Sequence, residues 1–318
     1  MRLIFKLSAI TILAMVMIFS GCNNQSKVNK IRIGYVPLAV VLPLYVANDE
    51  GFFKEQGFDV EMVRFASSNE VGNAGTTGQV DILSAASNVV FDIGFVSKKH
   101  HKLILPNLYT NKQGNITDYI LVRDTTAIKK IEDLKGKKIG VFPGSVIKVF
   151  CSLILEKYGL SKSDYELIEL SPKDWAASMQ TGQIDAVSAL EPQASQLIAD
   201  KIGYPISAGF YSQLMPNVPL SGNWISEDFY NKYGIENAKK IIFAVDKAVD
   251  FINTHPDKAK EYLVKYANVR EDVVNRVQLN PWGKHSEIKY SEIQKFIDVL
   301  YENKAIQNKE DINNYLIK

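Results

Sequence analysis

The chain has 318 residues, with 37 lysines and arginines against 35 aspartates and glutamates. This near balance excludes the basic footprint of a nucleic-acid-binding protein. Only two cysteines are present, which excludes a disulfide-rich scaffold. The length suffices for two lobes around a large buried core.

The N-terminus has the features of an export signal. Two basic residues precede an apolar run, residues 7–19, that is too short to span a membrane. Residues 18–22, Ile-Phe-Ser-Gly-Cys, resemble the bacterial lipobox, in which the cysteine thiol receives a diacylglycerol. We therefore expect a lipoprotein signal peptide over residues 1–21 and lipidation at Cys22. The alternative is an ordinary secretory signal with an incidental cysteine.

Lipidation would define the location of the protein. Residues 22–30 are polar and predict a flexible tether. No later apolar stretch is long enough to span a bilayer. We expect a protein anchored to the cell membrane by lipid on its extracytoplasmic face. Cys151, which then has no partner, is expected to be a small buried residue.

After residue 30 the chain alternates strand-like and helix-like segments. In the first half, period-two apolar alternation predicts strands at 31–36, 58–63, 80–83, 103–105 and 119–122. A helix over 43–50 has proline in its first turn and is ended by Gly51. Further helices are predicted over 68–77 and from Ser87 onward.

The second half repeats this alternation. Strands are predicted at 138–142, 165–170 and 184–190, helices at 131–136, 146–158 and 171–181, and mostly helix after residue 238. The strand at 184–190 is almost continuously apolar, as expected when helices cover both sheet faces. The order predicts an α/β protein with mostly parallel sheets flanked by helices.

One short motif occurs in both halves. Residues 77–82 have the sequence TGQVDI, and residues 181–186 have the sequence TGQIDA. This correspondence predicts two related lobes. A cleft between two such lobes is a natural ligand site, because helix N-termini and strand C-termini point into it.

The motifs occur in a recognisable order: PLYVA at 43–47, GFFKEQGFDVE at 51–61, GQVDI at 78–82, LKGKKIGV at 134–141, Gly144-Ser145, GQIDA at 182–186 and Glu191-Pro192. This order resembles the substrate-binding proteins of the nitrate/sulfonate/taurine type, a family that also contains thiamine-precursor binders. The resemblance implies a type II periplasmic binding protein fold with a ligand cleft between its lobes.

The resemblance also implies which residues contact the ligand: Leu38, Leu42, Ala86, Ser87, Asn88, Gly144, Ser145, Glu191 and Trp224. The two serines could equally be helix caps, Glu191 a solvated strand end and Trp224 a packing residue. The loop over 38–42 is apolar, which favours an apolar cleft wall. Apart from Lys148, the matched pocket stretches carry no Arg or Lys, so they do not promise bidentate recognition of a strong anion.

No catalytic constellation, metal-ligand spacing or phosphate-binding loop is present, so we expect no catalytic residue, no metal and no cofactor. Residues 98–102 have the sequence KKHHK. This charged run predicts that His100 and His101 lie in a solvated turn.

The resulting expectation is a monomeric solute-binding lipoprotein that makes and breaks no bond. Lobe 1 is expected over 31–115 plus 218–318 and lobe 2 over 116–217, with crossing segments near 112–118 and 214–222. The expected partners are a small organic solute, the permease of an ABC importer and the membrane. Sulfonates, pyrimidines, flavins and aromatic acids all stay open as solutes. The alternatives are an enzyme on the same scaffold, of the thiamine-pyrimidine or menaquinone-synthesis type, and a solute sensor for a signalling partner.

Overall fold

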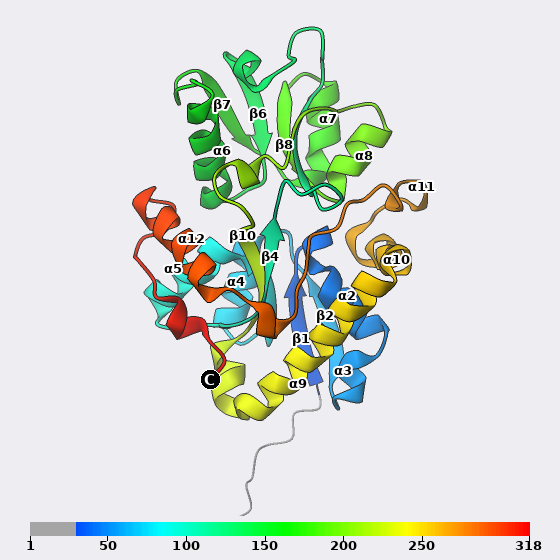
Figure 1. Ribbon diagram of the computed structural model, residues 1–318, viewed down its shortest axis with the longest axis vertical. Helices are drawn as coiled ribbons and strands as arrows, with labels where there is room; N and C mark the ends of the chain where they lie inside the picture. Colours follow the sequence, from blue (N-terminus) through cyan, green and yellow to red (C-terminus); the bar gives the residue numbers. More distant parts are fainter. Residues whose placement is uncertain (1–29) are drawn as a thin grey trace, which may run out of the picture.

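The computed structural model describes residues 30–318. Figure 1 shows two lobes, one above the other, each built on its own sheet. The first sheet, in lobe 1, contains β1 (Lys30–Tyr35), β2 (Asp59–Arg64), β3 (Ile82–Ala86), β4 (Lys102–Tyr109) and β10 (Val218–Ile225). The second sheet, in lobe 2, contains β5 (Asp118–Val122), β6 (Lys137–Val141), β7 (Tyr165–Glu169), β8 (Ala186–Leu190) and β9 (Tyr204–Ala208).

The two sheets have the same topology. Their strand orders are β2-β1-β3-β10-β4 and β7-β6-β8-β5-β9. In each sheet the fourth strand, β10 or β5, runs antiparallel to both of its neighbours. The α/β class and the mostly parallel sheets predicted from the sequence are therefore confirmed, and the single reversed strand in each sheet is an addition to that prediction.

Helices cover both sheets. In lobe 1 they are α2 (Leu42–Asp49), α3 (Phe52–Glu55), α4 (Ser68–Thr76), α5 (Ser87–Ser97), α9 (Glu227–Thr254), α10 (Pro256–Ala267) and α12 (Tyr290–Glu302). In lobe 2 they are α6 (Ser145–Lys157), α7 (Trp175–Gln180) and α8 (Gln193–Ala199), and α11 (Glu271–Val274) lies beside α8 (Figure 1). Short 3₁₀ turns are η1 (Ala39–Val41), η2 (Ile131–Leu134), η3 (Pro172–Asp174), η4 (Tyr211–Gln213), η5 (His285–Glu287) and η6 (Ile312–Tyr315).

Local signals explain most element boundaries. Gly51 has φ 77°, and Gly78 and Gly182, which follow α4 and α7, have φ 72° and 75°. These left-handed conformations end helices and favour glycine. The cap of α4 is Ser67, whose Oγ accepts a hydrogen bond from Glu70 N at 3.3 Å. The cap thus lies one residue before the helix that we predicted over 68–77.

Three predictions from the sequence need correction. The strand β1 begins at Lys30, which we had assigned to the tether. The strands β9 and β10 were not predicted, and the long helix α9 begins at Glu227 rather than near residue 238. Both missed strands contain a proline near their start, Pro205 and Pro219, which weakens a strand signal.

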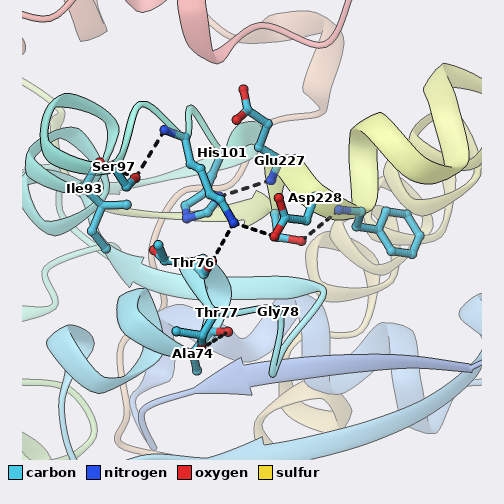
Figure 2. A network of polar contacts seen from close by, with 12 residues as sticks. Ala74, Thr76, Thr77, Gly78, Ile93, Ser97, His101, Glu227 and Asp228 are labelled. Carbon is cyan, nitrogen blue, oxygen red and sulfur yellow. Dashed lines mark hydrogen bonds and ion pairs between the residues drawn. The ribbon is translucent and has the colours of Figure 1, made fainter.

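The prediction of a solvated turn at His101 was wrong. The His101 side chain is fully buried, and its Nδ1 accepts a hydrogen bond from Glu227 N at the start of α9 (Figure 2). Beside it, Lys99 Nζ donates to Thr76 O at 2.8 Å and to Asp228 Oδ2 at 2.6 Å. Burial lowers the pKa of His101 to about 4, so this histidine is neutral and packs α9 against the first sheet.

The chain crosses between the lobes twice within residues 30–318, from β4 to β5 and back from β9 to β10. A further contact comes from the segment after α10, where Arg270 forms an ion pair with Asp200 of lobe 2 at 2.7 Å. Within residues 30–318 no helix is both long and apolar enough to cross a membrane.

Candidate functional site

A cavity lies between the two lobes, and we call it the inner cavity. Lobe 1 contributes the loop after β1, the end of β3 and the start of α5. Lobe 2 contributes the turn between β6 and α6 and the end of β8. The cavity volume is about 50 Å³, which is room for a few water molecules. Sites for small organic molecules measure about 300–1,000 Å³, so the lobes must separate to admit one.

The wall of the inner cavity is mainly apolar. Its aliphatic and aromatic side chains are Val36, Leu38, Val40, Val41, Val89, Tyr109, Phe142, Val146, Ile147, Leu190 and Leu220. Its polar side chains are Ser68, Asn69, Ser84, Asn88 and Ser221. None of the lining residues is Asp, Glu, Lys, Arg or His. The apolar cleft wall that we predicted from residues 38–42 is present at Leu38, Val40 and Val41.

Two helices begin at the inner cavity, one from each lobe. Ala86 precedes α5 and Gly144 precedes α6, and neither helix start has a side-chain cap. The first backbone N–H groups of a helix have no partner within that helix, and the helix dipole makes this end positive. The inner cavity therefore offers an apolar wall together with backbone donors from both lobes.

The structure brings four of the predicted ligand residues together. Leu38, Ala86, Asn88 and Gly144 line the inner cavity. Ser145 begins α6, but its side chain lies outside the described part of the structure. The lipidation residue Cys22 also lies outside the described residues.

Leu42 and Ser87 do not line the inner cavity. Leu42 is fully buried at the start of α2 and belongs to the core of lobe 1. Ser87 Oγ donates to Pro219 O at 2.8 Å. Its hydroxyl thus ties α5 to β10 instead of facing a ligand.

Trp224 packs in the core and does not line the inner cavity. Its ring makes edge-to-face contacts with Phe91 and Tyr315, at centroid distances of 6.0 and 6.1 Å. The packing alternative that we left open for Trp224 is the one that the structure shows.

Glu191 joins the lobes and is not a solvated strand end. Its buried carboxylate accepts from Ser195 Oγ at 2.8 Å, from Ser195 N at 3.2 Å and from Gln278 N at 3.5 Å. Its backbone O accepts from Ala39 N of lobe 1 at 3.3 Å. Burial raises the pKa of Glu191 to about 7, although the three donors favour the charged form.

Sequence reasoning missed several lining residues. Tyr109, Phe142, Leu190 and Leu220 lie at or near strand ends that face the other lobe. The signal that could have found them is their position, since strand ends of both sheets meet at the cleft. Among residues 30–318 no cluster of three or more His, Cys, Asp or Glu could hold a metal ion.

Comparison with known proteins agrees with this architecture. The family described as NMT1/THI5 like matches residues 39–259. A putative aliphatic sulfonates-binding protein of Bacillus subtilis is 25% identical over 96% of this chain and 93% of its own length. The nitrate/nitrite binding protein NrtA of a Nostoc species is 25% identical over 81% of this chain and 63% of its own length. The 4-amino-5-hydroxymethyl-2-methylpyrimidine phosphate synthase THI13 of Saccharomyces cerevisiae is 24% identical over 73% and 69%.

Solved structures show the same fold. The alkanesulfonate-binding protein SsuA of Xanthomonas axonopodis has a TM-score of 0.72 at 19% identity, over 92% of this chain and 97% of that one. The periplasmic nitrate-binding protein NrtA of Synechocystis has a TM-score of 0.74 at 16% identity, over 90% and 84%. The fold is that of type II periplasmic binding proteins, and the chain belongs to the NMT1/THI5-like family.

Proposed function

We propose that this protein captures a small organic solute between its lobes and delivers it to an ABC importer. The observation that supports this proposal is the inner cavity, whose wall and two helix N-termini come from both lobes. A solute held by both lobes binds the closed form better than the open form, so it shifts the population toward closure. The solute-binding relatives support the same class of function.

We also propose a division of the chain and a location. Lobe 1 comprises 31–115 and 218–318 and lobe 2 comprises 116–217, which agrees with the strands that each sheet contains except that β1 begins one residue earlier, at Lys30. Residues 1–21 are a signal peptide, and Cys22 carries a lipid that holds the protein at the outer face of the cell membrane. The support for this anchor is the lipobox-like sequence at 18–22.

Binding is favoured over catalysis at this site. Some relatives are named as pyrimidine phosphate synthases, so an enzyme on this scaffold is the other candidate. General acid–base chemistry needs a titratable group within hydrogen-bond reach of the substrate. The lining of the inner cavity has serine hydroxyls and Tyr109 but no His, Cys, Asp or Glu, and burial raises the pKa of Tyr109 far above its ordinary value.

The test is thermal unfolding of the purified full-length protein, freed of bound solute, against a panel of sulfonates, pyrimidines, flavins and aromatic acids. A solute at 100 times its Kd adds about 2.7 kcal/mol of stability, which raises Tm by several degrees. The variant Ala86→Phe fills the inner cavity and is expected to abolish the shift. Ala177→Phe, at an exposed position of α7, is the matched control and should retain it. An Ala86→Phe protein that still responds would contradict this site.

A further inference from the structure

Glu191 lies directly behind the wall of the inner cavity. The preceding residue, Leu190, lines the cavity from lobe 2, while Leu38 and Val40 line it from lobe 1. Ala39, between these two residues of lobe 1, donates its backbone N–H to Glu191 O at 3.3 Å. The two lobes are therefore hydrogen-bonded to each other one residue away from the surface that a solute would contact.

A second contact reaches Glu191 from residues 275–283, which we call the strap. Gln278 N of the strap donates to Glu191 Oε1 at 3.5 Å. The strap is fastened to lobe 1, because Trp282 Nε1 donates to Asn107 Oδ1 of β4 at 3.1 Å. Glu191 directly follows β8 and belongs to lobe 2, so separation of the lobes would pull it away from both of its lobe 1 donors.

The side chain of Glu191 is suited to hold or release a proton. Only 2% of this residue is exposed. Ser195 Oγ lies 2.8 Å from Glu191 Oε1, and a hydroxyl can donate to a carboxylate or accept from a carboxylic acid, so both protonation states have a partner. Burial disfavours the charged form and raises the pKa of Glu191 to about 7. In an open form, water at the carboxyl would return this pKa toward its ordinary value of 4.5.

Few other charges act on the Glu191 carboxyl. Lys260 of α10 favours its charged form, and the Tyr119 hydroxyl of β5 is neutral because burial raises its pKa above the ordinary value. The neighbouring buried carboxyl, Asp118, accepts instead from a backbone N–H of lobe 2. Neither α8 nor the loop over 37–41 contains a charged residue. The charged side chains in and just before the strap are all exposed: Arg270, Glu271, Asp272 and Arg276.

We propose that Glu191 takes up a proton when the lobes close, so that acidic surroundings favour the closed form. The inference rests on the proposed function and adds how its closure is regulated. Glu191 acts as a positioning residue, because it contacts both lobes and not the solute. Between about pH 4.5 and about pH 7 the closed form keeps a proton that the open form has lost. Closure, and with it the hold on a solute, therefore weakens as the pH rises through this window.

Pulsed electron paramagnetic resonance on the full-length protein measures closure without any solute. Spin labels are attached in the double variant Ala66→Cys and Lys173→Cys, at two exposed positions that line the space between the lobes from opposite sides. A Cys22→Ser background leaves Cys151 as the only native cysteine, and Cys151 is fully buried. We expect the ratio of closed to open molecules to fall at least tenfold between about pH 5 and about pH 8.

Three variants assign this response to Glu191. In Glu191→Gln, whose amide is neutral at every pH, the ratio should change less than twofold over the same range. Ser195→Ala removes a donor to the charged form, so the midpoint of the response should move up by about one pH unit. Asp118→Asn is the matched control, because Asp118 is also a buried carboxyl but its acceptor contact lies within lobe 2. This variant should respond to pH as the wild type does.

Three results would each overturn the inference: a lobe separation that does not depend on pH in the wild type, a pH response that persists in Glu191→Gln, or one that disappears in Asp118→Asn. If Glu191→Gln fails to fold, Ser195→Ala decides, since an unmoved midpoint in that variant would overturn the inference as well. The proposed function is judged separately, by the thermal shifts with the solute panel, because the distance measurement needs no solute.

Discussion

Asp81 and Asp185 make the same contact in the two lobes. Asp81 Oδ2 accepts a hydrogen bond from Arg32 N of β1 at 2.8 Å, and Asp185 Oδ2 accepts one from Lys138 N of β6 at 3.0 Å. Each carboxylate also faces an arginine, Arg32 at 3.1 Å and Arg123 at 3.5 Å. The repeated motif in the sequence is thus a repeated attachment between the second and third strands in the order of each sheet, β1 and β3 in the first and β6 and β8 in the second.

Removing these carboxylates should destabilise the protein unequally. Asp81→Ala loses the backbone bond and two close bonds to Arg32, at a cost of about 2 kcal/mol. Asp185→Ala loses hydrogen bonds with longer donor–acceptor distances and should cost about 1 kcal/mol. The free energy of unfolding in urea measures both. Asp59→Ala, an exposed position at the start of β2, should stay within about 0.5 kcal/mol, and a similar loss there would contradict this account.

The buried carboxyl of Asp118 predicts how stability changes with pH. Its Oδ2 accepts from Tyr211 N at 2.8 Å, whereas its Oδ1 has no partner within the described residues. Burial raises the pKa of Asp118 from 3.8 to about 7. Between these values the folded form keeps a proton that the unfolded chain has lost, so stability falls as the pH rises through this window.

Asp118→Asn should remove this dependence. Asparagine has nearly the same shape as aspartic acid but carries no charge, and its side-chain oxygen can still accept the hydrogen bond from Tyr211 N. The free energy of unfolding of the variant should exceed that of the wild type by an amount that grows from about pH 4 to about pH 7 and reaches up to about 4 kcal/mol. Urea unfolding at several pH values gives the difference curve, in which Glu191 contributes equally to both proteins. If the variant instead becomes less stable relative to the wild type as the pH rises, Asp118 is charged in the folded state.

Replacing Gly144, before α6, should destabilise the protein more than replacing Gly51, after α2. A Cβ at either Gly144 or Gly51 would meet no atom within 4 Å, so only the backbone conformation matters. Gly51 has φ 77° and ψ 13°, whereas Gly144 has φ 145° and ψ 143°. Gly51→Ala should cost about 1 kcal/mol, and Gly144→Ala roughly 2–3 kcal/mol. Chemical denaturation of the two variants gives the order, and the reverse order would contradict the assignment of strain.

Counting thiols tests the lipid anchor. Cys151 is fully buried, and burial raises the pKa of its thiol to about 12, so it should not react with an aromatic disulfide reagent in the native protein. After denaturation, the protein made in a lipoprotein-processing bacterium should show one reactive thiol. The Cys22→Ser variant, which keeps only Cys151, should also show one. Two thiols in the denatured wild type would exclude a lipid on Cys22.

The periodicity of apolar residues predicted the regular strands of this fold well, but it did not predict burial that depends on distant segments. The strands whose apolar residues alternate or run continuously, such as β1 and β8, were predicted within about two residues. His101 was misplaced because its charged neighbours suggested a solvated turn, although α9 covers it from far along the chain. Burial that depends on distant segments leaves little trace in local sequence.

The candidate site was predicted at the level of strand ends but not of side chains. Leu38, Ala86, Asn88 and Gly144 follow strand ends and line the inner cavity. Glu191 also follows a strand end, yet its carboxylate turns toward Ser195 and Gln278. Tyr109 and Phe142 lie outside the motifs that carry the resemblance, so only the three-dimensional arrangement brings them to the inner cavity.

The two sheets differ in how the chain connects their strands, and this difference has a consequence for the order in which the lobes can form. All five strands of the second sheet lie between Asp118 and Ala208, in one uninterrupted stretch. The first sheet instead needs β10, residues 218–225, to join β3 to β4. A growing chain can therefore complete lobe 2 while lobe 1 is still split into two unpaired parts. Lobe 2 is thus inserted into the chain of lobe 1, and the sheet of lobe 1 is completed only once β10 has been made.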